Sequence, residues 1–256
     1  MTARTRAATT LAARPRLGWV VDAQHDFMVP AERGGRLYVR NLGDTADEGA
    51  VRIERALART VRWMGAHCAA LVYTGDWHAD DDREIDRVSP NFRDTYPAHC
   101  MGAGADPAER PGAELIPAVA PERPLAIVDR DASADDAERA AREAAAGTPV
   151  MIRKREFSVF EGQAQTDRFL APLAEAIGAR PEIVVCGVAT DVCVKGAVDG
   201  FLDRDYAVTV VRDAVWGLGL VPDEELFADW ARRGARVARL AELEAERARH
   251  AGARSA

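Results

Sequence analysis

The sequence has little of what marks a membrane, nucleic-acid-binding or disulfide-rich protein. No apolar run approaches the roughly 20 residues that a membrane-spanning helix needs. With 34 basic and 41 acidic residues the net charge is −7, so a basic nucleic-acid-binding surface is not expected. The four cysteines do not have the spacing of a disulfide framework. We therefore predict reduced thiols and a cytoplasmic location.

The overall composition is typical of a globular protein, because 48% of the residues are hydrophobic and 29% are charged. The length of 256 residues fits one α/β domain. Residues 1–16 contain four arginines and no acidic residue, which is compatible with a disordered arm or a transit peptide. The arm is favoured, since charged termini without an apolar face stay loose. We predict one domain over residues 17–241 and a tail, a short solvated helix, over residues 242–256.

Short apolar runs alternate with segments of helical periodicity along the chain. The apolar runs are residues 17–21, 69–73, 125–128, 150–152, 183–188, 208–211 and 237–240. The helical segments are residues 49–66, 133–146, 166–178, 193–204 and 222–233. This pattern predicts an α/β fold with a doubly wound parallel sheet and helices on both faces. The active site of such a fold lies at the carboxyl ends of the strands, where Asp22, Asp76, Lys154 and the turn 189–193 fall.

Cys193 is the best candidate for a nucleophile. It follows a buried strand and a tight turn, and it opens a helix, where the helix dipole favours a thiolate. Unpaired backbone N–H groups at that position can also bind an oxyanion. The alternative is a small buried hydrophobic residue, which is the interpretation we prefer for Cys68 and Cys186. The role of Cys100, in a loop after His99, is left open.

Asp22 and Lys154 could complete a hydrolase site with Cys193. A carboxylate at the end of an apolar strand is costly unless it is paired or used. The carboxylate of Asp22 can take the thiol proton and later give it to a leaving amine, and the ammonium of Lys154 keeps that carboxylate ionised. The alternatives are a structural cap for Asp22 and a solvated Arg-Lys-Arg turn for Lys154. Composition alone favours the solvated turn.

Metal-ligating residue types gather in the long polar stretch that follows the second apolar run. Asp76, His78 and His99, with Glu84 or Asp86 between them, are plausible ligands for Zn, Mn or Fe. The spacing is not that of a standard zinc motif. A solvated Asp80–Asp82 run and packed histidines are therefore the alternative.

Five short segments resemble a known family when taken in order along the chain. They are VVDAQHDF, YTGDWH, YPAHC, MIRK and VVCGVATDVCV. The sequence resembles the isochorismatase-like cysteine hydrolases over roughly residues 17–215, and within that family it is most similar to the nicotinamidases (pyrazinamidases).

The resemblance implies a catalytic triad of Asp22, Lys154 and Cys193. It also implies an oxyanion hole formed by the backbone N–H groups of Ala189 and Cys193, with a cis peptide between Val188 and Ala189. The implied fold is a six-stranded parallel sheet of order 3-2-1-4-5-6.

The resemblance further implies one divalent transition metal, with Zn, Mn or Fe as candidates. The metal ligands carried over are Asp76, His78 and His99, with Glu84 at the place of a variable fourth ligand. The substrate pocket is expected to contain Phe27, Tyr96 and Phe157, of which Tyr96 replaces a frequent tryptophan.

Two departures from the nicotinamidase pattern border the expected pocket. The segment after Lys154 is short, as in isochorismatases and carbamoyl-amide hydrolases, and the loop 102–111 is longer than usual. We therefore expect a metal-containing cysteine amidohydrolase that cleaves a small carboxamide, nicotinamide to nicotinate and ammonia, through a thioester. The alternatives are another amidase of the superfamily and a non-catalytic binding protein on the same fold. No nucleic-acid or membrane partner is expected, and a homo-oligomer is an expectation by analogy.

Overall fold

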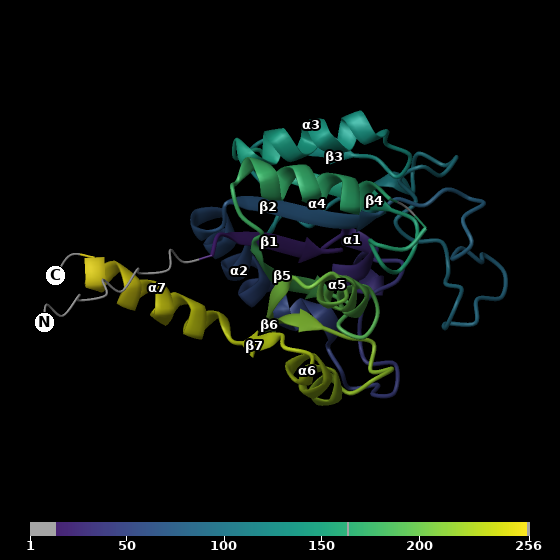
Figure 1. Ribbon diagram of the computed structural model, residues 1–256. Coiled ribbons are helices and arrows are strands. Elements are labelled where there is room, and N and C mark those ends of the chain that lie inside the picture. Colours follow the sequence, from purple (N-terminus) through teal and green to yellow (C-terminus); the bar gives the residue numbers. More distant parts are fainter. Residues whose placement is uncertain (1–13, 163, 255–256) are drawn as a thin grey trace, which may run out of the picture.

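The computed structural model describes residues 14–162 and 164–254, which form one parallel sheet covered by helices (Figure 1). The strands are β1 (Arg16–Val21), β2 (Ala70–Asp76), β3 (Ala126–Val128), β4 (Val150–Lys154), β5 (Glu182–Val188), β6 (Ala207–Trp216) and β7 (Arg236–Ala238). Their order is β3-β4-β2-β1-β5-β6-β7, and every pair is parallel. The predicted fold class, a doubly wound parallel sheet, is confirmed.

The predicted number of six strands is wrong, because the sheet has seven. The additional strand is β3, a three-residue segment that pairs with β4 at the sheet edge, Ala126 opposite Val150 and Val128 opposite Ile152. Without β3, the remaining strands have the expected order 3-2-1-4-5-6. The apolar run at residues 125–128 therefore adds an edge strand and leaves the inner topology unchanged.

Helices cover both faces of the sheet and surround two separate cores. The helical segments are α1 (His25–Met28), η1 (Ala31–Arg33), η2 (Gly49–Ile53), α2 (Glu54–His67), η3 (Arg110–Ala113), α3 (Ala134–Ala145), α4 (Gln165–Ala176), α5 (Cys193–Leu202), α6 (Asp223–Arg232) and α7 (Leu240–Arg254). On β1, Leu17, Trp19 and Val21 pack into the core under α3, α4, α5 and α6. Val20 points to the opposite core, under α1, α2 and α7. Both faces of β1 are thus buried, as expected for a central parallel strand.

The ends of the chain differ in how far they can be compared with the predictions. The predicted N-terminal arm lies outside the described residues except for residues 14–16, and Arg16 already begins β1. The C-terminal stretch forms the helix α7, which begins at Leu240 and extends away from the body of the molecule (Figure 1). Within residues 14–162 and 164–254, no helix is both long and apolar enough to span a membrane.

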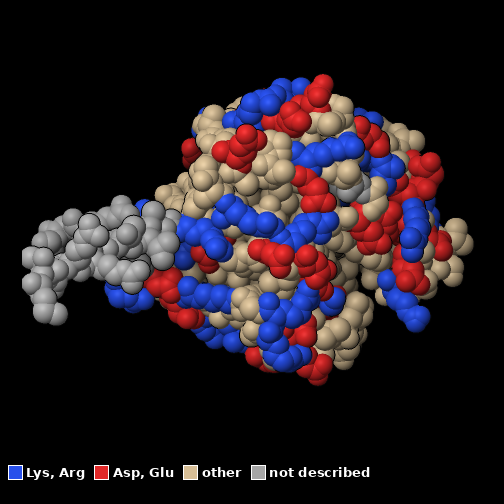
Figure 2. Space-filling view, viewed as in Figure 1, with Lys and Arg blue, Asp and Glu red and all other residues tan. Residues whose placement is uncertain are grey.

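The surface carries charges of both signs. Figure 2 shows lysine and arginine side chains interspersed with aspartate and glutamate over the visible face. The visible face therefore does not carry charge of a single sign.

The carboxyl ends of β1, β2, β4 and β5 meet at one edge of the sheet, and a long loop lies over that edge. The loop spans residues 77–125 between β2 and β3. It is fixed to the body by an antiparallel bridge between Gln24 and Leu115, and it is closed on itself by a bridge between Ile85 and Tyr96. The sheet edge and this loop together hold the polar residues that the sequence singled out.

Candidate active site

Cys193 is the first residue of α5 and is 7% exposed. The chain reaches it from β5 through a turn that begins with a cis peptide bond between Val188 and Ala189. Gly187, at the end of β5, has φ of 124°, and a Cβ there would lie 2.0 Å from the carbonyl oxygen of Val21 on β1. Only glycine lets β5 approach β1 this closely. Because Asp22 follows β1, this approach brings Asp22 and Cys193 to the same place.

Asp22, Lys154 and Cys193 form one buried cluster. The Lys154 Nζ lies 2.9 Å from Asp22 Oδ2 and 3.7 Å from Cys193 Sγ. A carboxylate oxygen of Asp22 lies within 4.8 Å of that sulfur. The hydroxyl of Thr74 donates a hydrogen bond of 2.7 Å to Asp22 Oδ1 and so orients the carboxylate. The expectation from composition that Lys154 is solvated is wrong, because its side chain is 1% exposed and paired with carboxylates.

Burial and ion pairing set the protonation of this cluster. Burial raises the pKa of Cys193 well above its usual value, although the nearby Lys154 opposes the shift. Burial also raises the pKa of Asp22, again against the effect of Lys154. Burial alone would lower the pKa of Lys154, but Asp22 and Asp76 raise it well above its usual value. Burial therefore favours the neutral thiol of Cys193, whereas Asp22 and Asp76 keep Lys154 charged.

The turn before Cys193 leaves backbone donors at the site. Its hydrogen bonds run from the N–H groups of Val192 and Val194 to the carbonyl of Ala189, and from Thr190 N–H to the carbonyl of Trp216. Within the described part of the chain, the N–H groups of Ala189 and Cys193 donate to no backbone carbonyl outside their own elements. Two such donors beside a nucleophile can hold a developing oxyanion.

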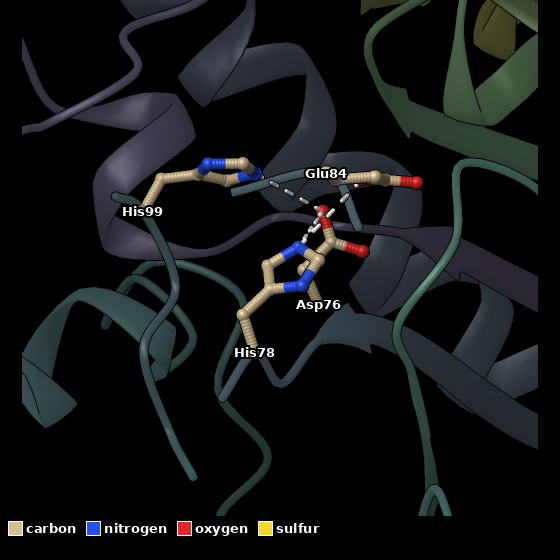
Figure 3. A group of neighbouring side chains, drawn as sticks. All are labelled: Asp76, His78, Glu84 and His99. Carbon is tan, nitrogen blue, oxygen red and sulfur yellow. Dashed lines mark ion pairs between the residues drawn. The ribbon is translucent and has the colours of Figure 1, made fainter. Parts of the chain in front are cut away.

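A second buried cluster lies beside the first and consists of Asp76, His78, Glu84 and His99 (Figure 3). One ligand atom from each of the four residues lies within 4.8 Å of the others. Asp76 Oδ2 is 3.7 Å from Nε2 of both His78 and His99, and Glu84 Oε2 is 3.8 Å from His78 Nε2. Asp76 ends β2, whereas the other three residues belong to the loop 77–125.

The donor set fits a divalent metal. His78 Nε2 and both carboxylate oxygens of Glu84 are buried without a hydrogen-bond partner. His99 Nδ1 lies 2.7 Å from the carbonyl of Pro97, which leaves its Nε2 free to act as a ligand. Imidazole nitrogens and carboxylates are ligands that suit Zn, Mn and Fe. Asp86, the alternative to Glu84, lies outside the cluster, because its carboxylate accepts hydrogen bonds from Val88 and Ser89.

The side chains of this second cluster shift one another's pKa values. Burial raises the pKa of Glu84 to about 8, and Asp76 adds to the shift. Burial would lower the pKa of His78, but Asp76 and Asp82 raise it to about 9. Burial lowers the pKa of His99. Asp76 and Glu84 thus lie together in a buried space, where a bound divalent ion would favour the ionised form of Glu84.

Asp76 belongs to both clusters. One of its carboxylate oxygens contacts Lys154 Nζ, and the other faces the two histidines. Although burial would raise the pKa of Asp76, Lys154 and the histidines lower it well below the usual value. The carboxylate of Asp76 is therefore ionised, and it links the cluster of Asp22, Lys154 and Cys193 to the two histidines of the second cluster.

A small, mainly apolar pocket lies between the two clusters. It is lined by Phe27, Leu37, Val39, Asp76, Glu84, Tyr96, His99, Phe157, Ala189, Val192, Cys193 and Leu218. The structure places Phe27, Tyr96 and Phe157, the residues expected at the pocket, in this wall. The rings of Tyr96 and Phe157 are in edge contact, with centroids 5.7 Å apart. No arginine lines the pocket among the described residues. The nearby cation is Lys154, which does not line the pocket but contacts the sulfur of Cys193.

Several residues of the site were not predicted from the sequence. Gln24 clamps Asp76, donating to its carbonyl at 2.7 Å and accepting from its N–H at 2.8 Å. Leu37, Val39 and Leu218 come from loops that carry no motif. The interpretation of Asp80–Asp82 as a solvated run is wrong for Asp82, which is 8% exposed. The only signal for Gln24 is its place two residues after Asp22, on the same strand end.

Residues 132–242 match the isochorismatase domain family. The structure of a pyrazinamidase of Pyrococcus horikoshii in complex with zinc is 25% identical, covers 88% of this chain and 99% of its own, and has a TM-score of 0.57. N-carbamoylsarcosine amidase from Thermoplasma acidophilum is 23% identical, with 88% and 96% covered and a TM-score of 0.57. The nicotinamidase/pyrazinamidase of Bacillus subtilis is 18% identical, with 88% and 99% covered and a TM-score of 0.58. No curated protein sequence matches the chain. The fold is therefore isochorismatase-like, and the chain is similar to the hydrolases of that family.

Proposed function

We propose that this protein is a cysteine hydrolase that cleaves a small uncharged carboxamide and releases ammonia, with nicotinamide as the first candidate substrate. One observation carries the proposal. The buried Asp22–Lys154–Cys193 cluster opens on an apolar pocket, and Asp76, Glu84 and His99 of the second cluster also line that pocket. This juxtaposition offers a nucleophile at one end and a ligand-binding group at the other.

The first half of the reaction uses the thiol. Cys193 Sγ attacks the amide carbonyl while its proton moves to the carboxylate of Asp22, so sulfur and carbon become bonded without a free thiolate in the resting site. The oxyanion is held by the N–H groups of Ala189 and Cys193. Asp22 then gives its proton to the amide nitrogen, the C–N bond breaks, and ammonia leaves. Lys154 stays protonated throughout, and its charge stabilises negative charge on Asp22 before the proton transfer and on the sulfur of Cys193 during it.

The second half reverses the roles with water. A water molecule attacks the thioester carbonyl while Asp22 takes one of its protons. The carbon–sulfur bond breaks, the carboxylic acid is released, and the proton returns to Cys193. Burial raises the pKa of Asp22, which supports this shuttle because a more basic carboxylate is a better proton acceptor.

Asp76, His78, Glu84 and His99 would hold a transition metal at the far wall of the pocket. When bound, that metal would supply a Lewis-acid contact for a ring nitrogen of the substrate. The chain's own contribution there is to hold the four side chains together in a space closed to water. The aromatic walls of Phe27, Tyr96 and Phe157 would enclose a flat ring.

The pocket lining favours a neutral aromatic amide over a carbamoylated amino acid, which is the main alternative substrate class. No lysine or arginine lines the pocket among the described residues, so apart from the proposed metal the lining offers no cationic partner for a carboxylate on the substrate. A non-catalytic binding protein on this fold is the alternative of another class, and the intact thiol cluster argues against it.

An ammonia-release screen tests the proposal. The full-length protein, supplied with Zn²⁺, is given nicotinamide, benzamide and an N-carbamoyl amino acid. We expect turnover of nicotinamide and a much lower kcat/KM for benzamide, which has the same shape without the ring nitrogen. Preferred turnover of the carbamoyl compound would transfer the assignment to the other amidase class. Release of ammonia from none of a broad set of carboxamides would contradict the proposed activity.

A further inference from the structure

The imidazoles of His78 and His99 in the second cluster are oriented by different kinds of hydrogen-bond partner. His99 uses a carbonyl two residues away, that of Pro97, at 2.7 Å from its Nδ1. The Nδ1 of His78 instead faces Asp82 Oδ2 at 3.3 Å, and that carboxylate accepts a second hydrogen bond from the N–H of Ala79 at 2.9 Å. The orientation of His78 therefore depends on a side chain that must itself be fixed.

Arg130 fixes Asp82 from a distant part of the chain. Its two terminal guanidinium nitrogens contact the two carboxylate oxygens, with Nη2 at 2.8 Å from Oδ1, and Nη1 also donates to the carbonyl of Trp77 at 2.9 Å. The side chains of Arg130 and Asp82 are 10% and 6% exposed. A fork-like arginine–carboxylate pair that is shielded from water imposes a fixed geometry on its partner.

The position of Arg130 gives the additional edge strand a function. Arg130 lies two residues beyond β3, the strand that departs from the expected sheet, and Gln165 of α4 donates to its carbonyl at 3.2 Å. The loop between β3 and α3 is thereby held over the start of the loop 77–125. β3, the strand that is absent from the expected six-stranded sheet, thus places the guanidinium of Arg130 against Asp82, the partner of His78.

We infer that Asp82 and Arg130 are positioning residues that set the metal affinity of the cluster by holding His78 with Nδ1 protonated and Nε2 directed at Asp76 and Glu84. This inference rests on the metal site of the proposed function. Partners of a ligand's second ring nitrogen fix its tautomer, and their loss typically weakens metal binding about 10–100-fold. Asp82 is no ligand itself, because it faces the ring nitrogen opposite to the cluster.

The test is zinc affinity, measured by competition with a chromophoric chelator on the full-length, metal-stripped protein. We expect Arg130→Gln and Asp82→Asn each to weaken Zn²⁺ binding about 10–100-fold. The matched control is Arg87→Gln, since Arg87 also ties the loop together, through Asp80 and Glu109, without approaching a histidine. Its affinity should stay within about threefold of the parent, as for a half-exposed pair.

A second readout separates positioning from mere folding. With Co²⁺ in place of Zn²⁺, the visible absorption of Asp82→Asn should differ from that of the parent, while Arg87→Gln should keep the parent spectrum. Arg130→Lys, which keeps the charge without the fork, should have an intermediate affinity. If Arg130→Gln fails to fold, Asp82→Asn carries the decision alone.

The outcomes also separate this inference from the proposed function. Equal losses of affinity in Arg130→Gln and Arg87→Gln, or unchanged affinity in Asp82→Asn, would overturn the inference while leaving the amidase assignment intact. Tight zinc binding that depends on Asp82, in a protein that hydrolyses no amide, would support the inference and contradict the function. A parent protein that binds no Zn²⁺ would overturn the inference and the metal site together.

Discussion

The two halves of the site are built in different ways. Asp22 and Lys154 stand directly at the ends of β1 and β4, and Cys193 begins the helix that follows β5, so the sheet itself fixes their separation. His78, Glu84 and His99 lie in the loop 77–125, whose one helical segment is the short 3₁₀ helix η3, and hydrogen bonds of their ring nitrogens orient the two histidines.

Under the proposed function, the half fixed by the sheet would carry out the reaction and the half on the loop would recognise the substrate. Groups that must move a proton over a short distance gain from a rigid frame, and the sheet edge supplies it. Groups that select a ligand can lie on a loop, where sequence changes alter the pocket without disturbing the core. Asp76, at the end of β2, contacts both halves.

The largest expected effect is on the thiol. Cys193→Ala should lower amide turnover by at least about 10⁴-fold, because no other group in the pocket can form the acyl intermediate. Ammonia release under saturating substrate measures it. Cys186→Ala and Cys68→Ala are the controls and should retain most of the activity. Similar losses in all three variants would show a structural effect and remove Cys193 from the role of nucleophile.

Lys154→Met should affect both rate and stability. Its ammonium is the shared partner of Asp22 and Asp76, and its removal leaves two buried carboxylates without a cation. Breaking a buried pair in this way costs about 3–5 kcal/mol of unfolding free energy. Urea denaturation measures the loss. The control, Lys195→Met, breaks a half-exposed pair with Asp199 and should cost less than about 1 kcal/mol. Equal costs would mean that the buried pairing is not what holds the sheet edge together.

The double variant His78→Ala, His99→Ala separates the two halves. It should bind no transition metal by elemental analysis and should lose kcat/KM for nicotinamide about 10²–10³-fold, because the ring is no longer oriented. The rate at which Cys193 reacts with iodoacetamide should stay close to that of the parent. His67→Ala, on the exposed side of α2, serves as the control. A matching fall in thiol reactivity would refute the separation of the two halves.

The smallest effect concerns an acid beside the nucleophile turn. Burial raises the pKa of Asp223 to about 6, and Asp191 adds to the shift. Because the folded pKa exceeds the unfolded value of 3.8, the folded state binds this proton more tightly, and its stabilising effect is lost as the pH rises through about 6.

Asp223→Asn should therefore raise the Tm at about pH 7.5 and lose that gain near pH 4. The gain is held to about 1 kcal/mol or less, since the side chain is half-exposed and Asp223 also opens α6, where a negative charge is favourable. Glu225→Gln, in the same first turn, measures the helix-dipole effect alone. A gain that is equal at both pH values would contradict the assigned pKa.

The sheet and its polar strand ends could be predicted from sequence because both depend on local patterns. An apolar run followed by Asp22 or Asp76 marks the end of a buried strand whatever the rest of the chain does. The burial of Lys154 could not be predicted, since it depends on carboxylates from two other strands. The third apolar run indicated β3, but its place at the edge follows only from pairing with β4.

The residues that hold the loop 77–125 could not be predicted from the sequence for a similar reason. Asp82 and Arg130 are 48 residues apart, and neither stands in a motif. Nothing in an Asp80–Asp82 run distinguishes the buried carboxylate from its exposed neighbours. The ligand types at His78 and His99 were visible, whereas the contacts that orient them require the folded loop.

The most direct test of the central claim is the mass of the intact protein after mixing with nicotinamide and acid quenching within the first turnovers. If Cys193 is the nucleophile, the mass increases by one nicotinoyl group, which peptide mapping locates on Cys193, which disappears as hydrolysis proceeds and which is absent from Cys193→Ala. Asp22→Asn should show less adduct at every time point. Ammonia release without any covalent adduct on Cys193, or with the adduct on another residue, would contradict the account.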